Sequence, residues 1–125
     1  MKIDSDLLYS KDHLWVRKIA DGQYQAGITD YAQDLLGDIV FVEFPTVGSQ
    51  LRASQPCGLV ESVKTGSDLH APMDGIVTQI NTTLQVNPEQ INDAPYKTWI
   101  FAFETQNDAS IQALLDATGY QKLIA

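Results

Sequence analysis

Residues 58–69 of this chain read Gly58-Leu59-Val60-Glu61-Ser62-Val63-Lys64-Thr65-Gly66-Ser67-Asp68-Leu69. The apolar first part predicts a strand, and residues 64–66 predict a tight turn that leads into a second strand. Such a hairpin holds the amine of Lys64 at its tip, in water. An amine presented in this way can be acylated, which turns the lysine into a long swinging arm. Since a turn lysine is most often there for solubility, the rest of the chain must decide between these interpretations.

Short apolar segments separated by turn formers continue on both sides of this hairpin. Strands are predicted near residues 49–52, 58–63, 67–71 and 75–81. Turns are predicted at Pro56 and at residues 64–66 and 72–75. Spacing this regular indicates a small β-sandwich or barrel rather than alternating β and α units. Two strand-turn-strand units, centred on Gly48 and Lys64, suggest an internal pseudo-duplication.

The N-terminal half contains a second hairpin and one strongly apolar strand. Segments 14–20 and 24–28 are rich in β-forming residues and flank Asp21-Gly22, a strong hairpin signal. Segment 38–44 carries apolar residues on both faces and is predicted to be a strand buried on both sides.

Two helices are predicted outside the strands. Thr29-Asp30 offers caps for a helix over 31–36, Asp30 with Gln33 resembles a capping box, and Gly37 ends this helix. After a polar loop over 82–95 and a strand over 99–104, a C-terminal helix is predicted over about 108–118. Asn107 or Asp108 caps this second helix and Gly119 ends it. Residues 1–125 are therefore expected to form a single domain, with a core over about 14–104.

Composition and charge exclude several classes of protein. A hydrophobic content of 44% with 19% charged residues is that of a globular chain rather than a disordered one. The net charge of -8 repels phosphate backbones, so we expect no nucleic-acid partner. The apolar runs are short and interrupted, so we expect no membrane span. The acidic N-terminus resembles neither a secretory signal nor a transit peptide, which favours the bacterial cytoplasm; a mitochondrial matrix protein with its transit peptide removed is the alternative.

The chain offers no recognisable catalytic or metal-binding grouping. Cys57 is interpreted as a small core residue, and His13 and His70 lie far apart in sequence with no ligand spacing, so we expect no metal. A nucleophile motif, a phosphate-binding glycine loop and a His-Cys cluster are all absent from the sequence. We therefore expect a non-catalytic carrier, in which an attached cofactor and partner enzymes supply the chemistry.

Glu61-Ser62-Val63-Lys64 with Ser67-Asp68 resembles the lipoyl attachment site of the glycine cleavage system H-protein family. The resemblance extends from about Tyr9 to the final helix. Its other motifs, in matching order and spacing, are His13-x-Trp15-Val16, Gly27-Ile28-Thr29-Asp30-Tyr31-Ala32-Gln33, Leu36-Gly37-Asp38-Ile39-Val40-Phe41-Val42, Pro45-x-x-Gly48, Ala71-Pro72, Gly75, Val77, Asn81, Asn92, Pro95-Tyr96 and Trp99.

The resemblance implies a fold, a cofactor and a set of partners. The fold would be mainly β, the barrel-sandwich hybrid or hammerhead of lipoyl and biotinyl domains, with small flanking helices. Lys64 would carry lipoate and shuttle the aminomethyl group of glycine from glycine decarboxylase to an aminomethyltransferase, with reoxidation by dihydrolipoamide dehydrogenase. Glu61 and Gly48 match positions associated with recognition by lipoate-attaching enzymes, although a turn at Gly48 explains that glycine equally well. Asp68 is a candidate counter-charge for the loaded arm. A carrier that visits several enzymes is expected to be a monomer.

Two departures from the family pattern affect the expected docking of the arm. The family commonly carries an acidic residue between His13 and Trp15, where this chain has Leu14, so a weaker hold on the loaded arm is expected. Thr65-Gly66 replaces the usual small residues, and Gly66 is expected to loosen the turn.

Three alternatives to the glycine cleavage carrier stay open. The first is a lipoyl donor or relay in lipoate transfer or a modification-linked system, which Leu14 slightly favours. The second is a biotin carrier, against which Val63 and Thr65 argue because methionine usually flanks that lysine. The third is an unmodified structural relative.

Overall fold

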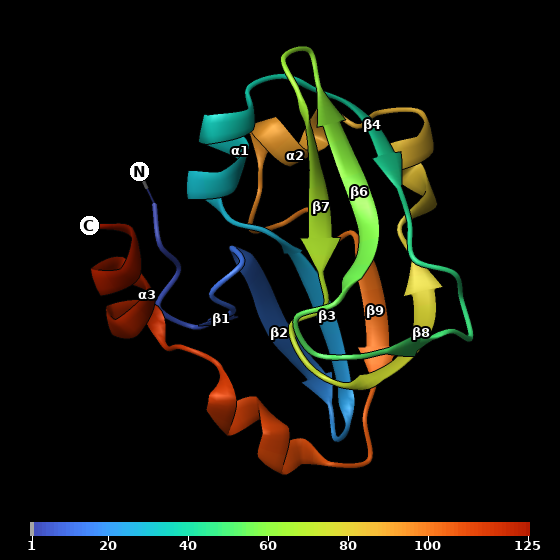
Figure 1. Ribbon diagram of the computed structural model, residues 1–125, viewed down its shortest axis with the longest axis vertical. Helices are drawn as coiled ribbons and strands as arrows, with labels where there is room; N and C mark the ends of the chain where they lie inside the picture. Colours follow the sequence, from blue (N-terminus) through green and yellow to red (C-terminus); the bar gives the residue numbers. More distant parts are fainter. Residues whose placement is uncertain (1) are drawn as a thin grey trace.

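The computed structural model describes residues 2–125, apart from the side chain of Asp108. Within these residues nine strands form two antiparallel sheets (Figure 1). The larger sheet has the order β1-β2-β3-β9-β8-β5, with β1 Leu8–Tyr9, β2 Leu14–Ala20, β3 Gln23–Ile28, β9 Phe101–Glu104, β8 Gly75–Ile80 and β5 Gln50–Leu51. The smaller sheet has the order β4-β6-β7, with β4 Ile39–Glu43, β6 Pro56–Ser62 and β7 Gly66–His70. The expected mainly-β fold is confirmed.

Small helices lie at the edges of the two sheets. They are α1 (Asp30–Leu36), the 3-10 helix η1 (Thr82–Gln85), α2 (Gln90–Asp93), the 3-10 helix η2 (Asp108–Ala113) and α3 (Ala117–Ile124). Helices α1 and α2 lie beside the end of the small sheet where the β6–β7 turn projects, and α3 lies near the N-terminal segment (Figure 1). Among the described residues, no helix has both the length and the apolar character needed to cross a membrane.

The predicted start and end of α1 are confirmed, but the predicted capping box is wrong. Thr29 is the N-cap, and its hydroxyl oxygen accepts a hydrogen bond from the backbone N–H of Ala32. Gly37 ends the helix with φ +81°, a value that favours glycine. Gln33 donates to the carboxylate of Asp30 at 2.7 Å instead of reaching back to the backbone of the cap.

Buried side chains form two clusters on opposite sides of the larger sheet. The main cluster contains Leu14 and Val16 from β2, together with the aromatic pair Phe101 and Phe103 from β9. Trp15, between those two β2 residues, belongs instead to the second cluster. The members of that second cluster are Leu7, Tyr9, Trp15 and Tyr120. The start of β2 is therefore buried on both faces, because the N-terminal segment and α3 cover its outer side.

The prediction that segment 38–44 is buried on both sides is wrong. Ile39 and Val42 are buried, but Val40 and Phe41 are each 51% exposed. β4 is an edge strand of the small sheet, and its pairing with β6 shifts register between Ile39 and Phe41. An irregularity of this kind breaks the alternation of faces, so two consecutive apolar side chains turn outward.

The predicted polar loop over 82–95 is also wrong, since it contains η1 and α2. Leu84 and Ile91 supply one apolar side chain from each helix, and both are 1% exposed. The surrounding Asn, Gln and Thr residues obscure this pattern, because each helix is too short to show an amphipathic period.

The C-terminal helix lies later in the chain than the predicted range of about 108–118. Residues 108–113 form η2, with Asn107 as its cap, and α3 begins only at Ala117; the alternative cap, the Asp108 side chain, lies outside the described residues. Gly119 is inside α3 rather than at its end, and its N–H donates to the side chain of the N-cap Asp116 at 2.8 Å. The core expected over about 14–104 extends to Tyr9 and Tyr120, both fully buried.

A chain of hydrogen bonds connects α3 to the start of β2. His13 Nδ1 lies 2.9 Å from the Tyr120 hydroxyl, which lies 2.7 Å from the hydroxyl of Thr29. The His13 ring also lies against Tyr31, with 5.0 Å between ring centroids. Burial lowers the pKa of His13 below its ordinary value of 6.5. Packing of α3 over His13 therefore favours the neutral form of the imidazole.

Because folding lowers the pKa of His13, we expect stability to fall as the pH drops below about 6.5. Below that value the unfolded chain binds the proton more readily, and the loss is at most about 1.4 kcal/mol per pH unit. Asp30, whose pKa is also lowered, contributes only below its ordinary value of 3.8. The check is the free energy of unfolding in urea, measured at pH 7.5 and 5.5 for the wild type and for His13→Asn. The wild type is expected to lose more stability between these two pH values than the variant. Asparagine tolerates the φ of +71° at this position. An equal pH dependence in both proteins contradicts the assignment.

Candidate cofactor-attachment site

One serine closes the turn that carries Lys64. The hydroxyl oxygen of Ser62 accepts hydrogen bonds from the backbone N–H groups of Lys64 and Thr65, each at 3.1 Å. The backbone N–H of Ser62 donates to the carbonyl oxygen of Thr65 at 2.7 Å. These bonds replace the ladder where β6 ends and β7 begins. The sequence analysis missed this role of Ser62, although serine just before a turn is a known signal for it.

The side chain of Lys64 rests on the corner between α1 and β4. A Cβ atom placed on Gly37 would lie 3.1 Å from Lys64 Cε, so the lysine stem packs closely over that glycine. Nζ donates to the carbonyl oxygen of Leu35 at 3.3 Å. The backbone N–H of the neighbouring Val63 donates to the carbonyl oxygen of Asp38 at 3.0 Å. The tip of the hairpin is thus held at a fixed place while the amine stays exposed to solvent.

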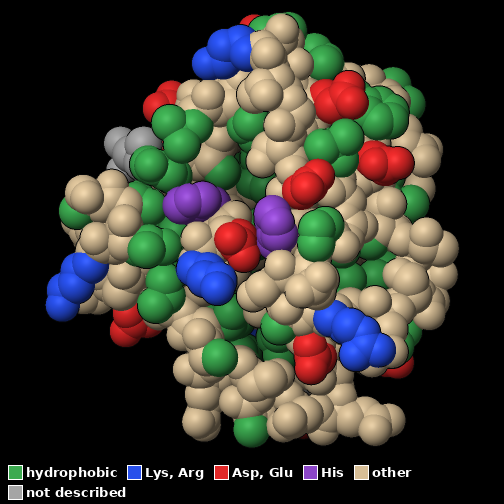
Figure 2. Space-filling model, in the orientation of Figure 1, with side chains coloured by type: hydrophobic (Ala, Val, Ile, Leu, Met, Phe, Trp, Pro, Cys, Tyr) green, Lys and Arg blue, Asp and Glu red, His purple; other side chains and the backbone are tan. Residues whose placement is uncertain are grey.

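Four large apolar side chains are exposed on the last turn of α1, on β4 and in the β6–β7 turn itself, and we call these four the apolar collar. Its members and their exposed fractions are Leu35 (58%), Val40 (51%), Phe41 (51%) and Val63 (66%). Three exposed carboxylate residues lie beside members of the collar: Asp34 precedes Leu35, Glu61 pairs with Phe41, and the backbone of Asp38 is hydrogen-bonded to that of Val63. Figure 2 shows acidic and hydrophobic side chains interspersed over the upper half of one face. Single exposed apolar residues are ordinary, but a group around one lysine indicates a contact surface.

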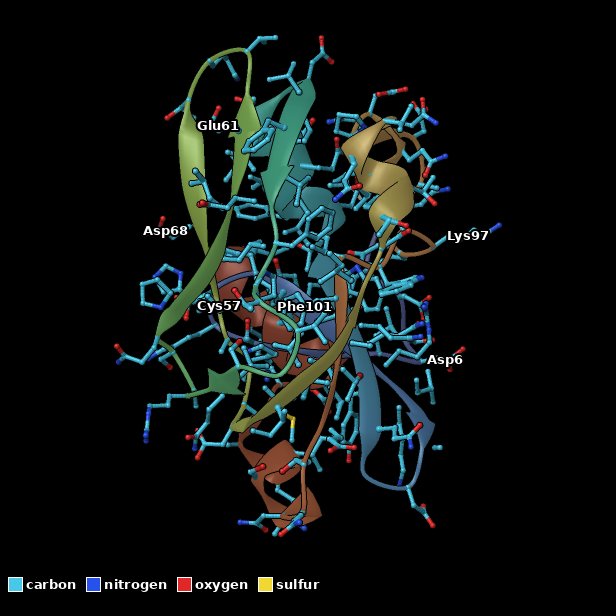
Figure 3. All side chains as sticks on the ribbon, turned by 90° about the vertical axis from the view of Figure 1, so that its right-hand side faces the viewer. Asp6, Cys57, Glu61, Asp68, Lys97 and Phe101 are labelled. Carbon is cyan, nitrogen blue, oxygen red and sulfur yellow. The ribbon has the colours of Figure 1, made fainter. Side chains whose placement is uncertain are left out.

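Glu61 lies toward the turn end of the β6–β7 hairpin and Asp68 lies farther from the turn (Figure 3). Glu61 is exposed on β6, opposite Gly66 on β7 and Phe41 on β4. Asp68 is exposed on β7, opposite Leu59, and follows Lys64 by four residues across the turn. Among the described residues, Asp68 and Lys64 form no salt bridge.

Gly48 is not part of the tip. It follows β4, whose five residues span about 16 Å and begin at the corner beneath Lys64. Its φ is +88° and its N–H donates to the carbonyl oxygen of Val77 at 2.8 Å. This geometry favours the structural interpretation of Gly48, because L side chains are strained at such a φ.

Two further residues from the sequence analysis lie in or against the main core. Cys57, predicted to be a core residue, is partly buried and packs against that core, and burial raises the pKa of its thiol to about 11. Leu14 is 1% exposed within the same core, so in this chain position 14 provides hydrophobic packing.

Comparison with known proteins gives a consistent result over almost the whole chain. A family model described as "Glycine cleavage H-protein" matches residues 7–125. A "Glycine cleavage system H protein" from Methylobacillus flagellatus is 59% identical over 124 residues, which cover 99% of this chain and 99% of that protein. One of the same name from Salmonella arizonae is 46% identical over 123 residues, covering 98% of this chain and 95% of that protein.

A solved structure agrees with these sequence matches. The crystal structure of a glycine cleavage system H protein from Mycobacterium marinum superposes with a TM-score of 0.86 at 36% identity. It covers 96% of this chain and 97% of that protein's chain. Sequence and fold agree, and this chain belongs to the glycine cleavage H-protein family.

Proposed function

We propose that this chain is a lipoyl carrier of the glycine cleavage system and that Lys64 is the attachment residue. The observation that carries the proposal is the exposed amine of Lys64, held at the tip of the β6–β7 hairpin in a member of this family. Within the described residues Lys64 forms no salt bridge, so no carboxylate competes with acylation of the amine.

The residues around Lys64 fit an acylated lysine. Amide formation removes the positive charge but leaves one N–H on Nζ, so the hydrogen bond to the Leu35 carbonyl oxygen can persist. The bonds from Ser62 to the turn involve only backbone groups of the following residues and are unaffected by acylation. When bound, lipoate would supply a cyclic disulfide that opens to carry the one-carbon group on one of its sulfur atoms between enzymes.

The apolar collar and its carboxylates suit enzymes that take the tip of the hairpin into a deep active site. Proposed partners are glycine decarboxylase, the aminomethyltransferase, dihydrolipoamide dehydrogenase and lipoate-attaching enzymes. Once Lys64 is acylated, the surface near the tip is acidic, and the whole chain carries a net charge of -8. A basic rim on each partner would therefore speed encounter, and the collar would supply apolar contact. We place this monomeric carrier in the bacterial cytoplasm, since the relatives named above are bacterial proteins.

Three residues keep proposed roles besides that of Lys64. Glu61, close to the tip, is proposed as a contact for lipoate-attaching enzymes. Gly48 is proposed to contribute to recognition by the same enzymes through the shape of the turn that it forms. Asp68 is proposed as the counter-charge for a cationic group on the arm, since β7 leads from Lys64 directly to it. Such a role requires the arm to fold back along the hairpin.

The alternative function is a lipoyl donor or relay that carries the same arm for a different reaction. Burial of Leu14 is the observation that favours it, because position 14 offers no carboxylate to a loaded arm. Asp68 would then be the remaining candidate counter-charge.

Two measurements test the proposal in sequence. The mass of the Lys64 peptide from protein purified from its native host is expected to show lipoate; an unmodified or biotinylated peptide would overturn the proposal. The lipoylated protein is then expected to support glycine–bicarbonate exchange with a glycine decarboxylase. Absence of exchange from protein proven to be lipoylated favours the relay.

A further inference from the structure

A single side-chain amide holds together the corner on which Lys64 rests. Asn92, on α2, accepts a hydrogen bond at Oδ1 from the backbone N–H of Ile39 at 2.9 Å. Its Nδ2 donates to the carbonyl oxygen of Gly37 and to Oε1 of Gln33, each at 2.9 Å. These three bonds connect the end of α1 to the beginning of β4. They therefore fix residues 37–39, which lie between these two elements.

Lys64 and its neighbour Val63 contact both this corner and the last turn of α1, which leads into it. Gly37 lies beneath the lysine stem, and the carbonyl oxygen of Asp38 accepts the backbone N–H of Val63 at 3.0 Å. The Leu35 carbonyl oxygen that accepts from Nζ belongs to the last turn of α1. The position of the tip thus depends on a corner whose own bonds come from α2.

α2 is well placed to act as this support. Ile91, adjacent to Asn92, is 1% exposed in the main core. The hydroxyl of Thr98 donates to the carbonyl oxygen of Gln90 at 3.0 Å, which ties the start of α2 to the segment before β9. Asn92 is therefore anchored to the core on one side and bonded to the corner on the other. Asn uses three of its four bonding positions here, a level that a loosely placed surface residue does not reach.

We propose that Asn92 is a positioning residue for Lys64: it keeps the 37–39 corner closed, and the closed corner presents the lysine to the enzyme that acylates it. The acylation part of this inference rests on the proposed function, whereas closure of the corner does not. An acceptor whose competent conformation is only partly populated binds with a correspondingly weaker apparent affinity. Opening of the corner therefore raises KM for the carrier and leaves kcat unchanged.

The experiment compares Asn92→Ala with two other variants of the apo chain. Gln33→Ala removes one of the three bonds and leaves those to Gly37 and Ile39; it also removes the bond from Gln33 to Asp30, which lies in the first turn of α1 and not in the corner. Asn81→Ala is the matched control, because the side chain of Asn81, just after β8, donates one hydrogen bond, to the carbonyl oxygen of Trp99 at 2.8 Å, while its backbone bonds do not depend on the side chain. The readouts are amide hydrogen exchange of Val63 by NMR and steady-state attachment of lipoate by a lipoate–protein ligase with ATP.

The loss of each hydrogen bond is expected to lower the equilibrium constant for closing of the corner about fivefold. Asn92→Ala then speeds exchange of the Val63 amide by roughly 100-fold relative to core amides of β9, and raises KM at least about threefold at constant kcat. Gln33→Ala speeds that exchange by about fivefold and hardly changes KM. Asn81→Ala is expected to alter neither quantity.

The outcomes separate this inference from the proposed function. Wild-type exchange at Val63 in Asn92→Ala, or equal acceleration in Asn81→Ala, overturns it. The inference is also overturned if Asn92→Ala speeds exchange of the Val63 amide but leaves the KM of the ligase for the carrier unchanged. If Asn92→Ala does not fold, Gln33→Ala carries the test through its fivefold effect. If the wild-type chain accepts no lipoate, the proposed function fails, whereas the exchange rates still decide whether Asn92 closes the corner.

Discussion

Lys64→Arg is expected to abolish lipoylation while leaving the fold intact. Arginine keeps the positive charge and similar length, but its guanidinium does not form the amide that a primary amine forms. The side chain is exposed and its hydrogen bond goes to one carbonyl oxygen, so the free energy of unfolding should change by less than about 0.5 kcal/mol. Intact mass after incubation with lipoate, ATP and a lipoate–protein ligase is the measurement. Glycine–bicarbonate exchange should disappear together with the mass increase.

Lys97→Arg is the matched control for this experiment. Lys97 is also exposed, and Figure 3 shows it pointing into solvent on the side of the molecule away from Glu61 and Asp68. The chain has six lysines, so this control shows whether replacing any exposed lysine by arginine lowers lipoylation. Lys97→Arg should be lipoylated like the wild type. Full modification of Lys64→Arg would place the attachment at another lysine and refute the assignment.

Gly58→Ala is expected to lower the free energy of unfolding by about 2–3 kcal/mol, or roughly 10 °C in Tm. Gly58 lies on β6 where that strand approaches β4, and an added Cβ would lie 2.6 Å from the carbonyl oxygen of Glu43. It would also lie 3.2 Å from Leu69 Cδ1. Because the closest atom belongs to the backbone, relief requires β4 and β6 to separate, and the collar residue Phe41 on β4 would move too. Thermal and urea unfolding measure the loss.

Gly66→Ala makes the same chemical change on the same hairpin and is the control. Here the nearest atom to the added Cβ is Leu59 Cδ1 at 3.6 Å, an ordinary contact, and the backbone does not have a positive φ. Alanine should therefore be tolerated and should stabilise by up to about 1 kcal/mol, because it restricts the unfolded chain. We therefore attribute the effect expected of Gly66 to the greater conformational entropy that a glycine gives the unfolded chain. Equal destabilisation by both substitutions would show that space near β4 is not the cause.

Local sequence signals predicted the two hairpins and α1 well. Asp21-Gly22 between β-forming segments was placed correctly, and the turn predicted at 64–66 is one residue from the observed turn at 63–65, since both depend on residues adjacent in sequence. Thr29 and Gly37 marked the ends of α1 for the same reason. Signals of this kind act over three or four residues and do not require knowledge of the rest of the fold.

Predictions failed where burial depends on distant partners. Segment 38–44 looks doubly buried by composition, but it is an edge strand with Val40 and Phe41 exposed. Conversely, the covering of Trp15 by α3 depends on residues more than 100 positions away. The hydrophobic periodicity and composition of a segment are local properties. Whether one of its faces is buried depends instead on which other parts of the chain pack against that face.

The sequence by itself determined that an exposed lysine follows a strand, that a serine precedes it, and that the chain resembles one family throughout. Only the tertiary structure brought Leu35, Gly37 and Asp38 beneath that lysine and bonded their corner to Asn92. The reason is physical. A turn forms from neighbouring residues, whereas the place of its tip is set by hydrogen bonds between residues 25 or more positions apart, which form only when the core has closed.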